Sequence, residues 1–351
     1  MRWTIVFLFF PLCSMAQRYD LVFTGGKIID GTGNAWFYGD VAVKSGKIAA
    51  IGKFSVANAD SVIDVRGLII SPGFIDVHTH IETNDLLVPS ADNFIFDGVT
   101  SVITGNCGGS ETDLTRYFFQ LDSVRTSVNV ATLIGHNSVR NAVMGASRRE
   151  ARREKNFAYA VVARYSSDTT LNGKNISEIN DLKGRKAKAM DEAETILEMV
   201  ENGSAQMVFF SMNEEDLKRI MQYPFNMFAS DAGIARFGVD APHPRTYGTN
   251  ARVLGHYVRS LKVIRLEEAI RRMTSLPAQK FQLRDRGLIR EGMAADLVVF
   301  NESTVADQST FSKPHAYSTG FEYIIVNGII TMASGRHTGA RNGQILKGPG
   351  S

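Results

Sequence analysis

Three apolar runs in the first half of the chain each end in polar residues and lead into a stretch with helical spacing. They cover residues 73–77, 99–104 and 128–134. The alternation returns later, with helices expected at 186–201 and 214–221 and strands at 158–164, 207–210 and 225–229. Strands that alternate with helices are typical of parallel β/α units. The pattern predicts an α/β fold in which a β/α barrel carries functional side chains at its strand ends.

The two ends of the chain have a different sequence pattern from this middle part. Short alternating or β-branched runs separated by glycine-bearing turns occupy residues 21–65. The same signal returns from residue 297 onward, where Asn327-Gly328 predicts a hairpin. We expect residues 17–71 and 287–351 to pair in one small β-sandwich, with the barrel in residues 72–286.

The N-terminus has the pattern of a secretory signal peptide. Arg2 precedes an apolar run that ends in small residues at 13–16, which predicts cleavage after Ala16 and a secreted or periplasmic protein. A buried N-terminal helix is the alternative, although polar residues 17–18 follow where such a helix would continue. Removal of residues 1–16 leaves Cys107 as the only cysteine, so no intrachain disulfide is expected.

Composition narrows the class of partner. The chain has 351 residues, of which 44% are hydrophobic, so it can bury a large core. A net charge of +3 is too small at this length to indicate a nucleic-acid surface. No later run reaches the ~18 consecutive apolar residues that span a bilayer. We therefore expect a small-molecule substrate, with no nucleic-acid partner and no membrane span.

Two histidines and a cysteine follow the first two apolar runs. His78 and His80 are separated by one residue, so on a strand both imidazoles can face one metal ion. Surface histidines are the alternative, because such a pair alone is a weak signal. Cys107 lies between Gly105 and Gly108, where the backbone can approach a ligand closely and a thiolate can bind zinc. A small buried side chain in a tight turn is the alternative for Cys107.

Two charged residues complete the candidate site. Asp231 follows the expected strand at 225–229, where a carboxylate beside a metal-activated water can take a proton and pass it to a leaving amine. A helix N-cap is the alternative for Asp231. Arg245 lies in a proline-containing loop and suits a substrate carboxylate, with a surface salt bridge as the alternative. His136 is a candidate for indirect support of the site, and His315 receives no role.

Taken together, these motifs resemble the D-aminoacylase (N-acyl-D-amino-acid deacylase) family of the amidohydrolase superfamily. The matching stretches are residues 30–33, 71–80, 105–108, 135–140, 230–231, 243–249, 273–278, 292–300 and 326–328. The resemblance implies a Zn²⁺-dependent hydrolase that deacylates N-acyl-D-amino acids, which contain a linear amide bond, by means of a zinc-activated water. It implies that His78 and His80 belong to one metal position and that Cys107 binds the tight zinc. It also implies that Asp231 is the catalytic acid and base and that Arg245 binds the substrate α-carboxylate.

The chain departs from that family at one place. Family members carry a long block, after the motif at 135–140, that holds two further metal-binding histidines. That block is missing here, with its junction near residues 151–155, and no histidine lies between His136 and His243. An eight-stranded barrel needs ~250 residues, more than residues 72–283 offer. We therefore expect an incomplete barrel: an open sheet, a barrel completed by another subunit, or a degenerate relative.

The missing block leaves two functions open. The first is an exported, zinc-dependent deacylase. The alternative is a catalytically impaired or inactive remnant or binding protein that binds zinc weakly. Two of the expected ligands of the tight zinc are absent, and catalytic zinc usually has three protein ligands.

Overall fold

The computed structural model describes residues 18–82, 84, 86–134, 138, 157–186, 188–203, 205–209 and 213–348. The expected signal peptide at 1–16, the junction at 151–155 and His136 lie outside the described residues. Within the described part of the chain, no helix is both long and apolar enough to cross a membrane.

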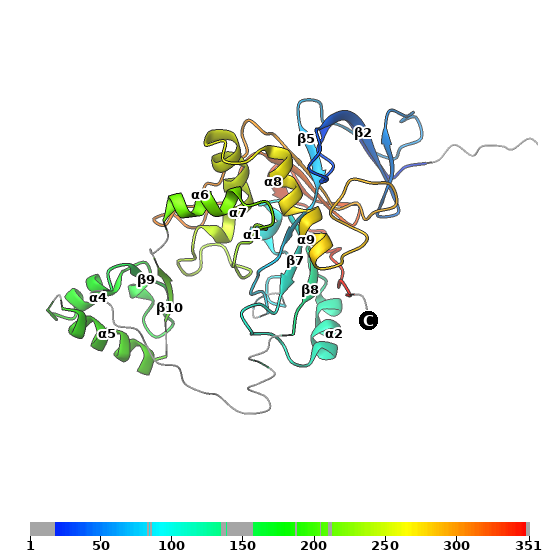
Figure 1. Cartoon of the computed structure of the whole chain (residues 1–351). Coiled ribbons are helices and arrows are strands. Elements are labelled where there is room, and N and C mark those ends of the chain that lie inside the picture. The colour runs from blue at the N-terminus through cyan, green and yellow to red at the C-terminus, as the bar shows by residue number, and fades with distance from the viewer. Residues whose placement is uncertain are drawn as a thin grey trace, which may run out of the picture.

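Strands from both ends of the chain pair with each other, as expected, and they form one continuous nine-stranded sheet (Figure 1). The strands are β1 (Leu21–Ile28), β2 (Phe37–Lys44), β3 (Lys47–Gly52), β4 (Val62–Asp64), β5 (Ile69–Pro72), β11 (Leu297–Phe300), β12 (Phe321–Val326), β13 (Ile329–Ala333) and β14 (Arg336–His337). Their order is β14-β13-β12-β11-β5-β1-β2-β3, and β4 pairs with β1. The two ends of the chain meet where β5 runs antiparallel to β11. The predicted hairpin joins β12 to β13, with Asn327 and Gly328 both at positive φ.

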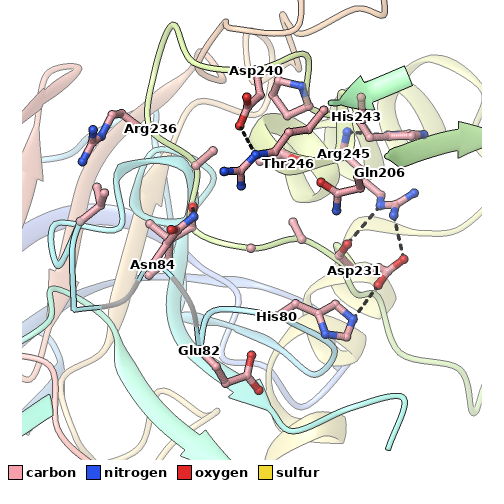
Figure 2. A pocket seen from close by; sticks show the side chains of 18 of the residues that line it. His80, Glu82, Asn84, Gln206, Asp231, Arg236, Asp240, His243, Arg245 and Thr246 are labelled. Atoms are coloured by element: carbon pink, nitrogen blue, oxygen red, sulfur yellow. Dashed lines mark hydrogen bonds and ion pairs between the residues drawn. The ribbon is translucent and has the colours of Figure 1, made fainter. Parts of the chain in front are cut away.

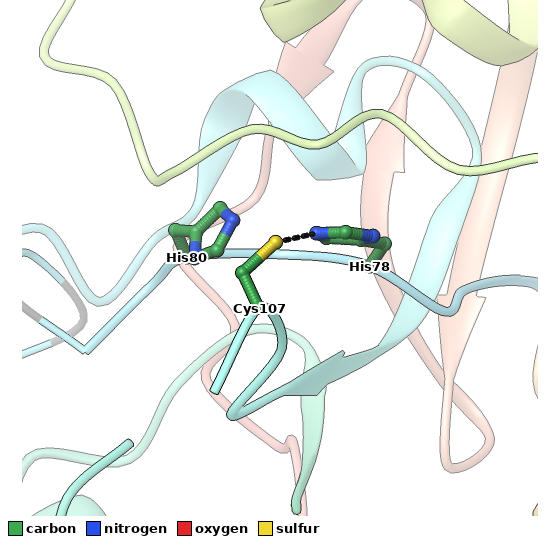
Figure 3. A group of neighbouring side chains, drawn as sticks. All are labelled: His78, His80 and Cys107. Atoms are coloured by element: carbon green, nitrogen blue, oxygen red, sulfur yellow. Dashed lines mark hydrogen bonds between the residues drawn. The ribbon is translucent and has the colours of Figure 1, made fainter. Parts of the chain in front are cut away.

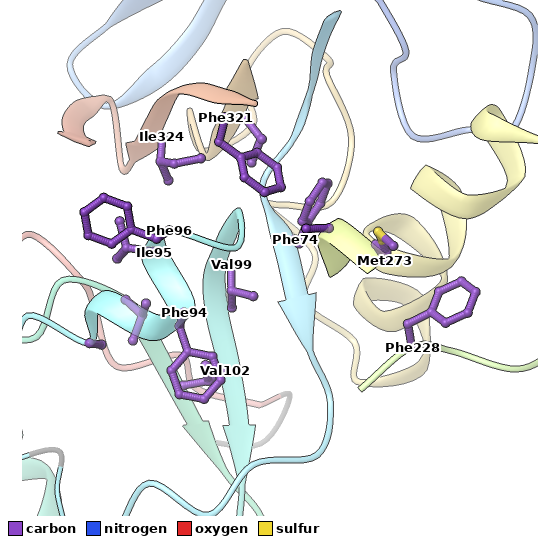
Figure 4. Close-up of a cluster of buried hydrophobic side chains, with 14 of the residues drawn as sticks. Phe74, Phe94, Ile95, Phe96, Val99, Val102, Phe228, Met273, Phe321 and Ile324 are labelled. Carbon is purple, nitrogen blue, oxygen red and sulfur yellow. The ribbon is translucent and has the colours of Figure 1, made fainter. Parts of the chain in front are cut away.

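Alternating side chains divide this sheet between two hydrophobic cores. Ile70 and Val299 belong to a core built among the strands of the sheet. Ile69 and Val298 face the other way, into the core shared with the β/α part. Figure 4 shows this second core, to which β12 contributes Phe321 and Ile324, with Phe321 beside Phe74. The ring centroids of Phe74 and Phe321 lie 6.2 Å apart. The nine-stranded sheet therefore supports the strands that carry the site.

Three parallel strands follow the first segment of that sheet. They are β6 (Phe74–Asp76), β7 (Val99–Thr104) and β8 (Asn129–Thr132), in the order β6-β7-β8, joined through helices α1 (Asp92–Ile95) and α2 (Leu114–Val124). The C-terminal segment covers the outer edge of β8, where Val130 bonds to the backbone of Gln344 and Leu346. Among the described residues the parallel sheet is open, which is one of the three arrangements that the sequence leaves possible.

Two strands expected in the barrel form a separate unit, so this expectation is wrong. β9 (Ala160–Arg164) and β10 (Gln206–Phe209) pair antiparallel and apart from the other sheets. Between them lie a short 3-10 turn (Thr169–Leu171), α4 (Ile176–Leu182) and α5 (Ala189–Glu201). Val162 of β9 packs against Ile179 and Met199 from these helices, so the unit has its own core. Figure 1 shows it to one side of the parallel strands β7 and β8.

The stretch at 225–229 is not a strand, which corrects a second expectation. Hydrogen bonds from side chains hold this segment in an irregular conformation: Asn226 donates to the carbonyl of Ile220, and the buried Arg272 donates to Asn226. Within residues 225–232, which the structure describes throughout, Ala232 alone makes a strand-like bridge, with Thr79. Asp231 therefore lies beside His78 and His80, as expected, although the strand expected before it does not form.

Helices in the last third of the chain pack around the parallel strands. They are α6 (Glu214–Gln222), α7 (Arg245–Arg252), a π-helical segment (Val253–Ser260), α8 (Leu266–Met273) and α9 (Ser275–Lys280). The predicted helix at 214–221 is confirmed, with Asn213 as its N-cap, and the one predicted at 186–201 begins at Ala189. Helix α7 places Arg245 at its first turn, facing the strand ends.

Candidate metal centre and active site

The two predicted histidines lie directly after β6. His78 and His80 extend to the same side, with ring centroids 5.3 Å apart, while Thr79 between them is buried and donates to the carbonyl of Ile103. This is the alternation expected of an extended chain. Both imidazoles are only partly buried, so they can reach a ligand in the adjoining cavity.

Cys107 lies in the loop after β7, where the backbone is unusual. Cys107 has a φ of 54°, a conformation that is uncommon without glycine and is often found at functional sites. Gly105 has a φ of 80°, and a Cβ there would come within 2.1 Å of the carbonyl oxygen of Leu133. The Glu82 carboxylate accepts the N–H of Gly105 at 2.8 Å and also holds Thr104. This loop brings Cys107 Sγ to 3.2 Å from His78 Nε2 (Figure 3).

Asp231 reaches the same place through long-range backbone contacts. Its N–H donates to the carbonyl of His78 at 3.0 Å, and the N–H of His80 donates to Ala232 at 2.9 Å. Asp231 Oδ1 lies 3.1 Å from His80 Nε2 and 3.5 Å from His78 Nε2. Asp231 also has a positive φ, of 51°. All four predicted groups, two imidazoles, a thiol and a carboxylate, therefore come together.

A buried carboxylate beneath the site joins the two segments that carry it. Asp76 accepts the N–H of His78 at 3.1 Å and the N–H of Ser230 at 3.2 Å. Burial raises the pKa of Asp76 to about 6, and the hydrogen bonds from Ser230 and His78 oppose that rise. Asp76 thus fixes the end of β6 relative to the residue before Asp231. Its position two residues before His78 is the sequence signal that could have identified it.

Arg245 contacts Asp231 rather than a distant surface group. Its Nη2 lies 2.8 Å from Asp231 Oδ2, and its Nε donates to the main-chain oxygen of Asp231 at 3.3 Å. His243 Nδ1 accepts the N–H of Arg245, and burial, together with the charge of Arg245, lowers the pKa of His243 to about 4. His243 is therefore neutral near pH 7 and adds no positive charge to that of Arg245 beside Asp231.

These groups line a cavity of about 800 Å³ (Figure 2). His80, Cys107, Asp231 and Arg245 lie on one part of its wall, and Gln206 and its neighbours from β10 form another part. A second cavity of about 390 Å³ borders His78 and Cys107 from the side of the exposed Ile134. The cluster is therefore accessible from two sides.

The donor set fits a zinc ion. One ligand atom from each of His78, His80 and Cys107 lies within 4.8 Å of the others. Ligands that surround one tetrahedral zinc at about 2.0–2.3 Å are separated by roughly 3–4 Å, so small side-chain adjustments suffice. Two imidazoles and one thiolate are donors that zinc commonly takes in proteins.

Comparison with known families agrees with this geometry. A model of the amidohydrolase family matches residues 61–208 and 148–332. The chain belongs to the amidohydrolase family.

Three similar proteins indicate the branch of the family. The N-acyl-D-glutamate deacylase of Alcaligenes xylosoxydans xylosoxydans is 27% identical over 482 aligned residues, which cover 95% of this chain and 97% of that protein. A solved N-acyl-D-glutamate deacylase from Bordetella bronchiseptica, in complex with zinc and a phosphonate inhibitor, has a TM-score of 0.83 at 25% identity, with coverage of 94% and 100%. A D-aminoacylase with a binuclear metal centre has a TM-score of 0.82 at 26% identity, with coverage of 93% and 99%. These neighbours confirm the predicted amidohydrolase architecture.

The alignment also supports a missing block. It extends over 482 positions, whereas this chain has 351 residues, so the relative contains many residues without a counterpart here. The described residues of this amidohydrolase offer two histidines and one cysteine to a metal. The roles assigned to individual site residues remain predictions. Sequence reasoning missed Glu82, Asp76 and His243, which hold the candidate groups in place.

Proposed function

We propose that this amidohydrolase is a zinc-dependent hydrolase that removes the acyl group from N-acyl-D-amino acids. The observation that carries the proposal is the convergence of His78, His80, Cys107 and Asp231, with Arg245 bonded to Asp231 at 2.8 Å. The similar proteins named as N-acyl-D-glutamate deacylase and D-aminoacylase support the same reaction class. A linear amide bond next to a carboxylate is a substrate that matches these groups.

His78, His80 and Cys107 would hold the zinc ion. When bound, zinc polarises the acyl carbonyl and makes water a good nucleophile at neutral pH. The Asp231 carboxylate takes the proton from the attacking water and delivers it to the amine nitrogen as the C–N bond breaks. Asp231 Oδ1 lies 3.1 Å from His80 Nε2 and 3.5 Å from His78 Nε2, so this oxygen would be within reach of a water bound beside the two imidazoles.

Arg245 would bind the α-carboxylate of the substrate. Its guanidinium can form two parallel hydrogen bonds with a carboxylate, which fixes the orientation of the amide. Arg245 also contacts Asp231, so it would place the carboxylate of the substrate close to the group that handles the proton.

The test is hydrolysis of paired D and L substrates by purified protein with a measured zinc content. We expect release of amine from N-acetyl-D-amino acids that depends on zinc and is much slower with the L forms. Protein that holds one zinc per chain and hydrolyses neither form would overturn the proposal.

We also propose that the protein is exported, with the signal peptide cut after Ala16. The charged start and short apolar run at 2–16 support this. N-terminal sequencing of protein from the native host is expected to begin at Gln17, and recovery of Met1 would contradict export.

A further inference from the structure

A second cavity borders the candidate metal centre. It has a volume of about 390 Å³ and shares Asn106 and Cys107 with the first cavity. His78 lines the second cavity, whereas His80 and Asp231 line the first. Figure 3 shows the thiol of Cys107 between the two imidazoles. A substrate whose amide lies at this cluster can therefore extend into both cavities.

The walls of the two cavities differ in charge. Arg164, Arg236 and Arg245 line the first cavity. Among the described residues that line the second cavity, no side chain carries a carboxylate, an ammonium or a guanidinium group. Its titratable side chains are those of His78 and Cys107, which belong to the candidate metal centre. A charged group that entered the second cavity would lose hydration without gaining an opposite charge, so this cavity suits an uncharged part of a substrate.

Polar groups in the wall of the second cavity are engaged within the protein. Asn106 is buried, and its side-chain amino group donates to the carbonyl of Val77 at 3.0 Å and to that of Ile103 at 3.4 Å. The N–H of Leu133 donates to the carbonyl of Thr104 at 2.9 Å. These bonds hold the wall in place and use donors that a polar ligand would need.

Apolar side chains complete this wall. Leu133 and Ile134 follow β8 and line the second cavity together with Val77. Their exposed fractions are 41% for Leu133 and 64% for Ile134. Exposed apolar side chains gathered at a cavity are typical of a site for an apolar ligand. The volume of this cavity lies in the range of roughly 300–1,000 Å³ that small-molecule sites occupy, which is far more than the methyl group of an acetyl substrate fills.

We propose that the second cavity binds an aliphatic chain, so that the preferred substrates are N-acyl-amino acids whose acyl group is a chain of several carbons. The inference rests on the proposed deacylation. In this arrangement Arg245 binds the carboxylate in the first cavity, the amide lies beside Asp231, and the acyl chain lies along Leu133 and Ile134. Water adds to the acyl carbon, the C–N bond breaks and the amine takes the proton. The products are a fatty acid and an amino acid.

The first test varies the length of the acyl chain at a constant amino acid. For the acetyl, butanoyl, hexanoyl and octanoyl derivatives of D-alanine, we expect kcat/KM to rise about twofold with each methylene, and at least about 50-fold from acetyl to octanoyl. Full burial of a methylene is worth roughly fourfold, and the exposure of Ile134 shows that this cavity is partly open.

Variants at the two cavities locate the chain. Ile134→Gln and Leu133→Gln should each flatten the dependence on chain length, because a polar side chain of similar size replaces an apolar one. Ile134→Leu should keep the dependence. Leu87→Gln is the matched control, because Leu87 is 67% exposed and lines the first cavity. It should leave the dependence on chain length unchanged. Loss of this dependence in Leu87→Gln but not in the variants of the second cavity would overturn the proposal.

Calorimetric binding of the acyl products, from acetate to octanoate, separates this inference from the deacylation itself. These carboxylates are not turned over, so their binding reports on the cavity even if no hydrolysis occurs. An affinity that rises with chain length in the wild type and not in Ile134→Gln supports the acyl site, whether or not the amides are hydrolysed. Hydrolysis with no dependence on chain length would overturn the acyl site and leave the deacylase intact. Equal affinities for acetate and octanoate would also overturn it.

Discussion

The main-chain N–H of Asp231 donates a hydrogen bond of 3.0 Å to the carbonyl oxygen of His78. This contact joins residues that lie far apart in the sequence and fixes the carboxylate beside the strand end that carries two imidazoles. Together with the hydrogen bond from the N–H of His80 to the carbonyl of Ala232, it holds the candidate proton-transfer group beside the candidate metal ligands through the backbone.

Asp231→Asn should abolish most of the deacylation. The amide cannot accept the proton from water, so we expect kcat/KM for an N-acetyl-D-amino acid to fall by roughly 10³-fold, within the range for general acid–base groups. The amide keeps the size of the carboxylate, so the melting temperature and zinc content should change little. Robust hydrolysis by this variant would show that another group moves the proton.

The purified protein should hold one zinc per chain. Cys107→Ser should weaken zinc binding by a factor on the order of 100, because a hydroxyl is a much poorer zinc donor than a thiolate. Competition with a chromophoric chelator measures the affinity, and elemental analysis gives the stoichiometry. His256→Ala is the control, because this ring packs against Tyr257 and lies outside the cluster. An unchanged affinity in Cys107→Ser would remove Cys107 from the ligand set.

Sequence periodicity predicts the parts of the site that depend on local geometry. The placement of His78 and His80 follows from strand alternation, and that of Cys107 from the glycines around it. Periodicity does not predict that β9 and β10 pair antiparallel with each other, because an apolar run does not show which strand it will pair with. Contacts of Val162 with α4 and α5 decide that these strands pair with each other.

The sequence around Asp231 also does not predict the contacts that place this residue in the site. The expected strand before it does not form. The hydrogen bonds from Ser230 N–H to Asp76 and from Asp231 N–H to the carbonyl of His78 place it instead. Arg164 gives no sequence signal at all, since it becomes part of the cavity only when β9 contacts the loop at Ala241. Such contacts between distant segments are fixed by tertiary packing.

Glu268 should make the stability of the protein sensitive to acid. The hydrogen bond from Arg271, assisted by Arg272, lowers the pKa of Glu268 to about 2. The unfolded chain titrates near 4.3, so the stabilisation is fully present above about pH 4.3 and is lost as the pH falls toward 2. Urea unfolding of wild type and Glu268→Gln should differ by about 1–2 kcal/mol at pH 6 and converge near pH 2. A constant difference across that interval would contradict this assignment.

Asp76 should support both the stability and the metal site. Asp76→Ala leaves the N–H groups of His78 and Ser230 buried without an acceptor, at a cost of about 1–3 kcal/mol for each group in the free energy of unfolding. Asp76→Asn keeps the oxygen that accepts both bonds, so we expect it to lose less than half as much. Zinc affinity should follow the same order, because His78 is displaced only in the alanine variant. Urea unfolding and chelator competition on the two variants measure these effects, and equal losses would show that the charge of Asp76 matters more than its hydrogen bonds.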